Sequence, residues 1–411
     1  MPTRRTALPP RPPVSERDRS LGRLQRRLLV HCGLRDLVLL YPVYALLFAE
    51  HGLSTAEISS LFVIWSLTSL LAEVPSGVWA DAVSRRSALV TGPLLTGAGF
   101  ALWVTVPSYP SFAAGFVLWG LGGALASGAL EALVYEELAR LDATDRYARL
   151  MGRSAALATL ATAAATAAAA PVFAAGGFPA LGVASVAACL LCALVAASLP
   201  ENRDARAADA DAQEPGYGAV LRSGLAEVRR SAAVRRALVT VVVLSTVWGS
   251  LDEYVPLLAA ATGVATPDVP LLVLVVYVGV ALGGVLAARA QGMSARRTAA
   301  LLTVSAGLMA VGALTGSPWG FVLLAVAFCV FQLADVVADA RLQDALSGPS
   351  RATVTSLAGL GTEVTTLLVY AVYGAASGQV AHGALFALFA LPYLVVAGAL
   401  AGAAARPRPA P

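Results

Sequence analysis

The chain has 411 residues, of which 58% are hydrophobic and 13% charged. Its mean hydropathy of +0.73 is too high for a soluble globule with a wet surface. The formal net charge is +4, and the basic residues, all arginine, are scattered among loops, which argues against nucleic acid as a partner. The composition predicts a polytopic, all-α membrane protein.

The chain begins with a Pro- and Arg-rich stretch, residues 1–20, that we expect to be disordered. Leu21, Leu24 and Leu28 then recur at helical spacing among arginines, which predicts a short helix on the membrane surface. The leader carries too many arginines for a cleaved signal peptide, so we expect the first apolar run to remain as an anchor.

Twelve apolar runs follow, each close to the roughly 20 residues that a helix needs to cross a bilayer. They are predicted at 29–49, 56–80, 87–106, 111–136, 150–174, 178–199, 236–259, 269–289, 298–315, 318–340, 352–376 and 381–404. The chain thus divides into a cytoplasmic arm (1–28), a six-helix half (29–199), a cytoplasmic linker (200–235), a second six-helix half (236–404) and a disordered tail (405–411).

The arginines test this topology independently, because loops that stay in the cytoplasm retain positive charge. Every arginine except Arg35 lies in or beside the leader, every second loop, the linker or the tail. The loops on the opposite side contain none. We therefore expect a multi-pass protein with both termini cytoplasmic. Arginine without lysine, together with abundant alanine, is typical of a GC-rich genome and favours the inner membrane of a bacterium.

No cluster of residues in the sequence indicates catalysis. The four cysteines lie inside apolar runs and the three histidines are isolated at span ends, without the spacing of metal ligands. Glycine-rich stretches, such as Gly279 and Gly283, lie in mid-span with no lysine following, which predicts close helix packing rather than a phosphate loop. We expect no enzyme activity and no cofactor.

The turn between the second and third runs carries a recognisable pattern: Gly77, Asp81 four residues later, and then Arg85 and Arg86. This resembles the loop between helices two and three of the major facilitator superfamily. The resemblance implies a secondary transporter with twelve helices in two halves, alternating access, and a binding site between the halves.

The resemblance also implies a gating role for this hairpin. In the relatives the aspartate contacts the cytoplasmic end of a helix from the other half and steadies the outward-facing state, so we expect Asp81 to do so here. For Arg85 and Arg86 the alternative is that they only fix the topology. The two readings are compatible.

Further motifs resemble one bacterial branch of the superfamily. They are Glu73-x-Pro-x-Gly, Ser127-Gly-x-x-Glu-Ala-x-x-Tyr and Arg351-Ala-Thr-Val-x-Ser. Two departures matter. Phe116 precedes Gly120 where proton-linked members often have an arginine, and the stretch from Ala170 matches the antiporter signature only in part.

Charged side chains inside the membrane are functional candidates, because they are costly unless they are paired or face a wet cavity. In the first half these are Arg35, Asp36, Glu73 and Glu131. Arg35 is the only base, so we expect it to pair with one of the acids. The group is either a substrate or proton site, or a static ion pair that locks helices together.

The second half carries Asp252, Glu253, Asp335, Asp339 and Glu363. Glu363 lies twelve residues past Arg351, about 18 Å deep and near the bilayer centre. No arginine in this half reaches that depth, so we expect Glu363 to act as a proton carrier or to contact a cationic substrate. Asp252 and Glu253 lie nearer the outer end, where water can reach them.

The leading hypothesis is proton-coupled efflux, by an antiporter, of a small amphipathic or drug-like molecule. Arg35, Asp36, Glu73, Glu131, Asp335 and Glu363 are the candidates for substrate and proton coupling. The second hypothesis is uptake or facilitated transport of a polar or anionic solute bound by Arg35. The third is a membrane sensor or scaffold without turnover. The expected partners are a small-molecule substrate, protons and the lipid bilayer, and we expect a monomer.

Overall fold

The computed structural model describes residues 14–82, 84–201, 228–346 and 350–405, and all the regular elements within them are helical. The first group of helices is α1 (Val14–Asp36), α2 (Tyr44–Glu50), α3 (Thr55–Ala82), α4 (Arg85–Thr105), α5 (Tyr109–Ala126), α6 (Ala129–Arg140), η1 (Thr144–Arg146) and α7 (Tyr147–Ala197). The second is α10 (Ala232–Asp252), α11 (Val255–Ala260), η2 (Thr266–Asp268), α12 (Val269–Ala290), α13 (Ala295–Leu314), α14 (Gly320–Ala345), α15 (Ser350–Ala376), α16 (His382–Leu388) and α17 (Leu391–Ala405).

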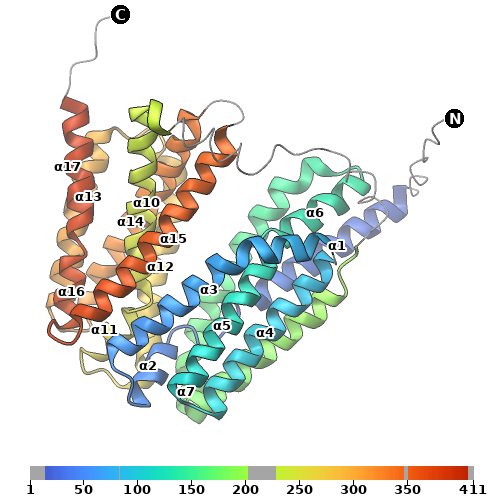
Figure 1. Ribbon diagram of the computed structural model, residues 1–411, viewed down its shortest axis with the longest axis horizontal. Coiled ribbons are helices and arrows are strands. Elements are labelled where there is room, and N and C mark those ends of the chain that lie inside the picture. The colour runs from blue at the N-terminus through green and yellow to red at the C-terminus, as the bar shows by residue number, and fades with distance from the viewer. Residues whose placement is uncertain (1–13, 83, 202–227, 347–349, 406–411) are drawn as a thin grey trace, which may run out of the picture.

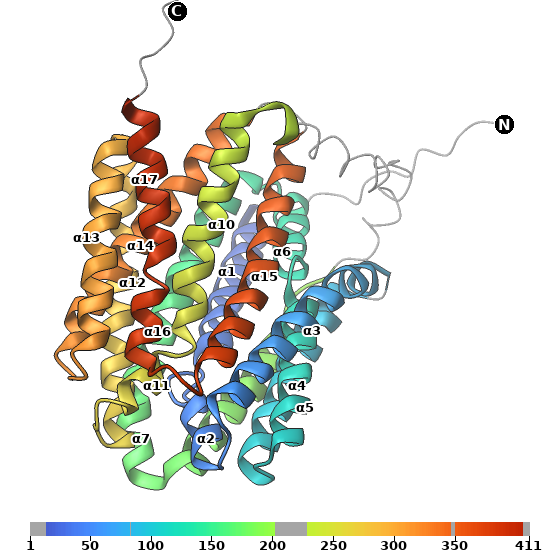
Figure 2. The same ribbon diagram turned by 60° about the vertical axis from the view of Figure 1, so that its left-hand side comes forward.

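The two groups form two halves that meet at one end and diverge at the other (Figures 1 and 2). The helix α1 begins and α17 ends at the diverging end, which we call the terminus end. Elements of the two halves pack together, namely α2 with α11, α3 with α15, and α7 with both η2 and α12. The two halves that were predicted are therefore present, and their helices diverge toward the terminus end.

Ten stretches of described helix are long and apolar enough to cross a membrane. Two features account for the difference from twelve. The helix α7 covers the predicted span 150–174 and most of the span 178–199, and the chain reverses between them at Gly176 and Gly177, where φ is −163° and 60°. The predicted first span is divided between α1 and the short α2. With these two features, each predicted span has a helical counterpart.

The first helix of each half breaks just after an acidic residue. In the first half α1 ends at Asp36 and α2 begins at Tyr44, and in the second half α10 ends at Asp252 and α11 begins at Val255. The fourth predicted span is also broken, because Gly128 takes a φ of 69°, a left-handed conformation that favours glycine. Breaks at membrane depth expose backbone groups, and such breaks are tolerated where they line a cavity.

Glycines bring neighbouring helices into close contact, as predicted. A Cβ at Gly279 or Gly283 would clash with the backbone of α14, at Ala325 and Cys329 respectively. Bare glycines thus allow α12 and α14 to pack backbone to backbone, as small residues do in membrane helices.

The leader differs from its prediction. Leu21, Leu24 and Leu28 lie in α1 and are buried in a cluster with residues of α6 and α7, such as Leu138 and Leu150. The apolar face of this helix packs on the protein itself, because a 3.6-residue period fits a protein groove as well as a membrane surface. The prediction of disorder was wrong for residues 14–20, which belong to α1. Residues 1–13, 202–227 of the linker and 406–411 of the tail lie outside the described residues, so the predictions made for them are untested.

Candidate functional site

A cavity of about 230 Å³ lies between the two halves. Three elements line it: α3 from the first half, and α10, with the break that follows it, and α15 from the second. We call it the interface cavity. Its lining residues are Trp65, Ser66, Ser69, Ser245, Thr246, Gly249, Glu253, Thr362, Glu363, Thr366 and Tyr370.

The lining is polar and acidic. Six of these residues are serine or threonine, and two, Glu253 and Glu363, are carboxylates, whereas none is basic. No hydrogen bond or ion pair within the described residues engages either carboxylate. Glu73 of α3 faces Glu363 across the halves at electrostatic range, which adds negative charge rather than compensating for it. An unpaired carboxyl at this depth is stable when it is protonated or when it contacts water or a cation.

Asp335 is not among the residues that line the interface cavity, but it contacts one of them. The Ser245 hydroxyl, which lines the cavity, donates a hydrogen bond to Asp335 Oδ1 from the neighbouring helix. Asp339, one turn further along α14, is exposed. The structure thus links Asp335 to the cavity through Ser245.

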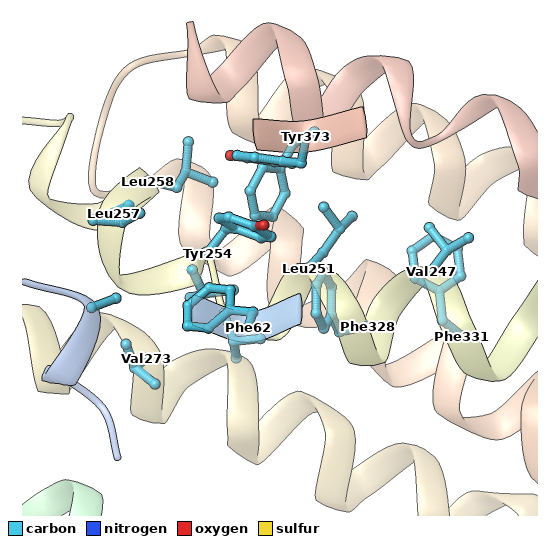
Figure 3. Packing of buried hydrophobic residues seen from close by; sticks show 14 of the residues in the cluster. Phe62, Val247, Leu251, Tyr254, Leu257, Leu258, Val273, Phe328, Phe331 and Tyr373 are labelled. Carbon is cyan, nitrogen blue, oxygen red and sulfur yellow. The ribbon is translucent and has the colours of Figure 1, made fainter. Parts of the chain in front are cut away.

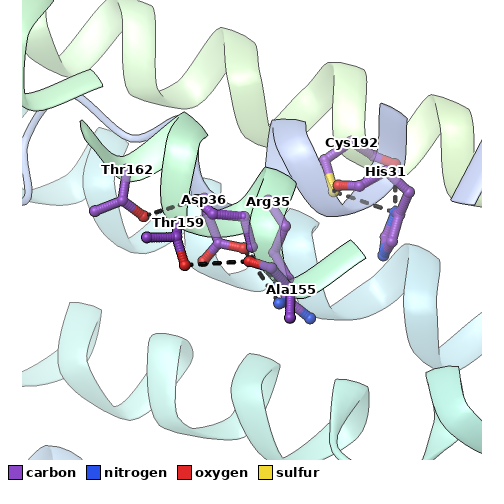
Figure 4. Close-up of polar contacts among 8 residues, drawn as sticks. His31, Arg35, Asp36, Ala155, Thr159, Thr162 and Cys192 are labelled. Carbon is purple, nitrogen blue, oxygen red and sulfur yellow. Dashed lines mark hydrogen bonds and ion pairs between the residues drawn. The ribbon is translucent and has the colours of Figure 1, made fainter. Parts of the chain in front are cut away.

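A second cavity, of about 350 Å³, lies inside the first half and contains Arg35, Asp36 and Glu131. We call it the amino-terminal cavity. The Arg35 guanidinium pairs with Asp36, with 3.1 Å between Nη2 and Oδ2, and Figure 4 shows the two side chains together. The predicted pairing of Arg35 is therefore between neighbours in the sequence. Both side chains are partly exposed, at 42% and 25%, so water screens this pair.

Three stacked aromatic rings separate the two cavities. Trp65 lines the interface cavity and stacks on Trp119, with 4.8 Å between ring centroids. Trp119 in turn stacks on Tyr41 at 5.4 Å, and both of these line the amino-terminal cavity. Arg35 and Glu131 thus line one cavity, whereas Glu253 and Glu363 line the other.

Above the interface cavity, aromatic side chains close the end of the molecule opposite the terminus end. The Tyr254 and Ser59 hydroxyls lie 2.8 Å apart across the halves. Phe62 of α3 packs against Tyr254 and Tyr370, with centroids at 5.4 and 5.3 Å, and Tyr254 stacks on Tyr373 at 3.6 Å. Figure 3 shows Phe62 inserted among side chains of the second half. We call this group the outer closure, using outer only for the end opposite the terminus end.

The hairpin motif lies at the terminus end. Arg85 pairs with Glu136 on α6, so this arginine joins helices within the first half. The Arg86 guanidinium donates a 3.5 Å hydrogen bond to the carbonyl of Leu199, after α7. Gly77 lies in α3 with open space around its Cα, and the side chain of Asp81 lies outside the described part of the structure.

Glu201 adds a contact that sequence reasoning missed. Its carboxylate accepts hydrogen bonds from the Ser84 hydroxyl at 2.6 Å and from the backbone N–H of Arg86 at 3.3 Å. Partial burial alone would raise the pKa of Glu201, but these hydrogen bonds outweigh it and hold the pKa below its ordinary value. The carboxylate therefore stabilises the amino terminus of α4, the usual place for an anion.

The structure sorts the predicted site residues into groups. Glu363 lines the interface cavity, Asp335 lies behind it, and Glu73 is exposed on α3 facing it. The trio Arg35, Asp36 and Glu131 lies in the amino-terminal cavity. Sequence reasoning named Glu253 but left it out of the candidate site. The signal for its place was an acid followed by Tyr-Val-Pro, the pattern of a helix break.

A model of the family described as Major Facilitator Superfamily matches residues 34–361. No curated protein matches the sequence. Among solved structures, a mutant of the nucleoside transporter NupG superposes with a TM-score of 0.77 at 12% identity, covering 92% of this chain and 99% of its own. A D-xylose-proton symporter superposes with a TM-score of 0.70 at 14% identity, covering 93% of this chain and 97% of its own. At such identities the similarity shows the fold alone.

Proposed function

The chain belongs to the major facilitator superfamily, and we propose that it is a proton-coupled carrier that moves a small hydrophilic solute through the interface cavity by alternating access. The family and fold are those of membrane transporters, which bind small molecules and in general are not enzymes. The proposal adds the site, the class of solute and the coupling ion.

One observation carries the proposal: two unpaired carboxylates, Glu253 and Glu363, face a small hydroxyl-lined cavity between the halves. The hydroxyls match the hydrogen-bonding groups of a polar solute, and Trp65 and Tyr370 offer faces for stacking. The carboxylates gain or lose a proton as the environment of the cavity changes from one side of the membrane to the other. In this account Glu363 contacts the solute and exchanges protons with the cavity.

The size of the cavity favours a small solute over a drug-like one. Pockets for drug-sized ligands hold roughly 300–1,000 Å³ and are mostly apolar, whereas this cavity holds about 230 Å³ and has a polar lining. The neighbours in fold include a nucleoside transporter and a D-xylose-proton symporter. Efflux of an amphipathic molecule therefore has less support than transport of a polar solute, and the proton symporter among these neighbours favours uptake.

The geometry gives little support to an anionic solute held by Arg35. The guanidinium is already paired with Asp36 and lies in the amino-terminal cavity, beyond the aromatic stack. We propose that both termini are cytoplasmic, following the arginine distribution, so the conformation described here, which opens toward the terminus end, is the inward-facing one.

Binding to the purified protein tests the proposal. Trp65 lines the cavity, so a solute that binds there changes its fluorescence, and Trp65→Phe removes that signal. The probes are uridine, D-xylose and tetramethylammonium. We expect at least one to bind with an affinity that depends on pH and falls at least tenfold in Glu363→Gln, whereas Asp339→Asn, on an exposed acid of the same half, binds as the parent does. Binding that is unchanged in Glu363→Gln would contradict the assignment of this cavity.

A further inference from the structure

Asp252, at the end of α10, has an unusual environment for an acidic side chain. Its Oδ2 accepts a hydrogen bond from the hydroxyl of Tyr277, on α12, at 3.2 Å. Its Oδ1 is buried and has no hydrogen-bond partner within the described residues. The site lies where α10 breaks before α11, next to the interface cavity.

The groups around Asp252 do not compensate a negative charge. The next residue, Glu253, is itself acidic, and Tyr277 and Tyr370, from α12 and α15, are the phenols within electrostatic range. Tyr41, from the first half, lies at the same range from Tyr277 and Glu253. No arginine forms an ion pair with Asp252 in the described part of the chain. A dry carboxylate oxygen without a cation is unstable, whereas a carboxylic acid is tolerated there.

Glu253 supplies a route from this site to water. It follows Asp252 in the chain and lines the interface cavity, where no described group holds its carboxylate. The two acids are therefore consecutive in the chain, one of them buried and the other at the cavity.

We propose that Asp252 is a buried proton-binding site of this carrier, and that Glu253 passes its proton to and from the interface cavity. In the release step the O–H bond at Asp252 Oδ1 breaks and an O–H bond forms on the Glu253 carboxylate, which then gives the proton to cavity water. Tyr277 is a positioning residue, because its hydroxyl fixes Oδ2 and leaves Oδ1 to carry the proton. The inference rests on the proposed function, to which it adds the place where the coupling ion is held.

Infrared spectroscopy of the purified protein tests this inference without any solute. A protonated carboxylic acid has a carbonyl band that a carboxylate lacks, so a pH titration follows each buried acid. We expect a band that persists at neutral pH in the parent and in Asp339→Asn. The component of the band that Asp252 contributes should be lost in Asp252→Asn, which has nearly the same shape as the protonated acid, while any component from Glu253 or Glu363 remains. We expect Tyr277→Phe to keep the band but to move its titration to higher pH, because the lost hydrogen bond favoured the charged form.

Each other outcome counts against the inference. A band that is undiminished in Asp252→Asn would assign the proton elsewhere, and a titration unmoved in Tyr277→Phe would deny Tyr277 its role. A band that responds to sodium chloride rather than to pH would make Asp252 a metal-cation site instead. These results are independent of solute binding to Trp65, so the inference can fail while the proposed function holds.

Discussion

Gly374 provides the sharpest test of the outer closure. It lies on α15 where α3 crosses, and a Cβ added there would lie 2.7 Å from the Cβ of Ser59. Carbon atoms in contact prefer separations of about 3.5–4.0 Å, so Gly374→Ala forces the two halves apart by about 1 Å at this point. Overpacking of this kind costs about 1–3 kcal/mol. This clash exists only in the conformation with the outer side closed. We therefore expect the ratio of the outer-closed to the outer-open population to fall about 5- to 150-fold.

The assay is a distance measurement across the outer closure. Spin labels at Thr105 and Ala265, both exposed near the outer ends of the halves, report whether the outer side is open. We expect longer distances in Gly374→Ala than in the parent. The matched control is Gly359→Ala on the same helix, where an added Cβ meets nothing within 4 Å. Equal distance distributions in the Gly374→Ala variant and the parent would refute the reasoning.

Three smaller effects follow from other contacts. Tyr254→Phe removes the cross-half hydrogen bond to Ser59, so the same labels should show a shift of about 1 kcal/mol toward the outer-open state. Glu136→Gln breaks a partly exposed ion pair with Arg85 and should lower the free energy of unfolding by no more than about 1 kcal/mol. High salt screens the pair in the parent, so the difference between parent and variant should disappear there. Because the folded-state pKa of Glu201 is lowered from 4.5, Glu201→Gln should cost most stability at neutral pH, and melting curves should converge with the parent as the pH falls below that value.

The transmembrane architecture could be predicted because the features that determine it can be read along the sequence. Apolar runs and the side on which arginines fall depend on the sequence alone, and each predicted span has a helical counterpart in the structure. The contacts of Gly279 and Gly283 were predictable for a similar reason, since small residues in a mid-membrane helix have few other uses.

The candidate site was predictable only in part. The depth of Glu363 indicated a functional group, but its companions Trp65 and Glu253 come from other helices, and no local pattern places them together. Asp252 and Glu253 were predicted to be near water, because a linear count of residues does not show that α10 breaks below the outer closure. The depth of a residue in the membrane follows from counting residues along its span, whereas its neighbours from other helices are known only from the fold.

The proposed mechanism requires that solute and proton meet at the interface cavity. The most direct measurement is solute-driven proton movement in lightly buffered proteoliposomes, with a pH-sensitive dye inside and uridine or D-xylose, whichever binds, added outside. We expect a pH change on addition of the solute to the parent and to Asp339→Asn, and none in Glu363→Gln. A pH change of the parent's size in Glu363→Gln would contradict the account.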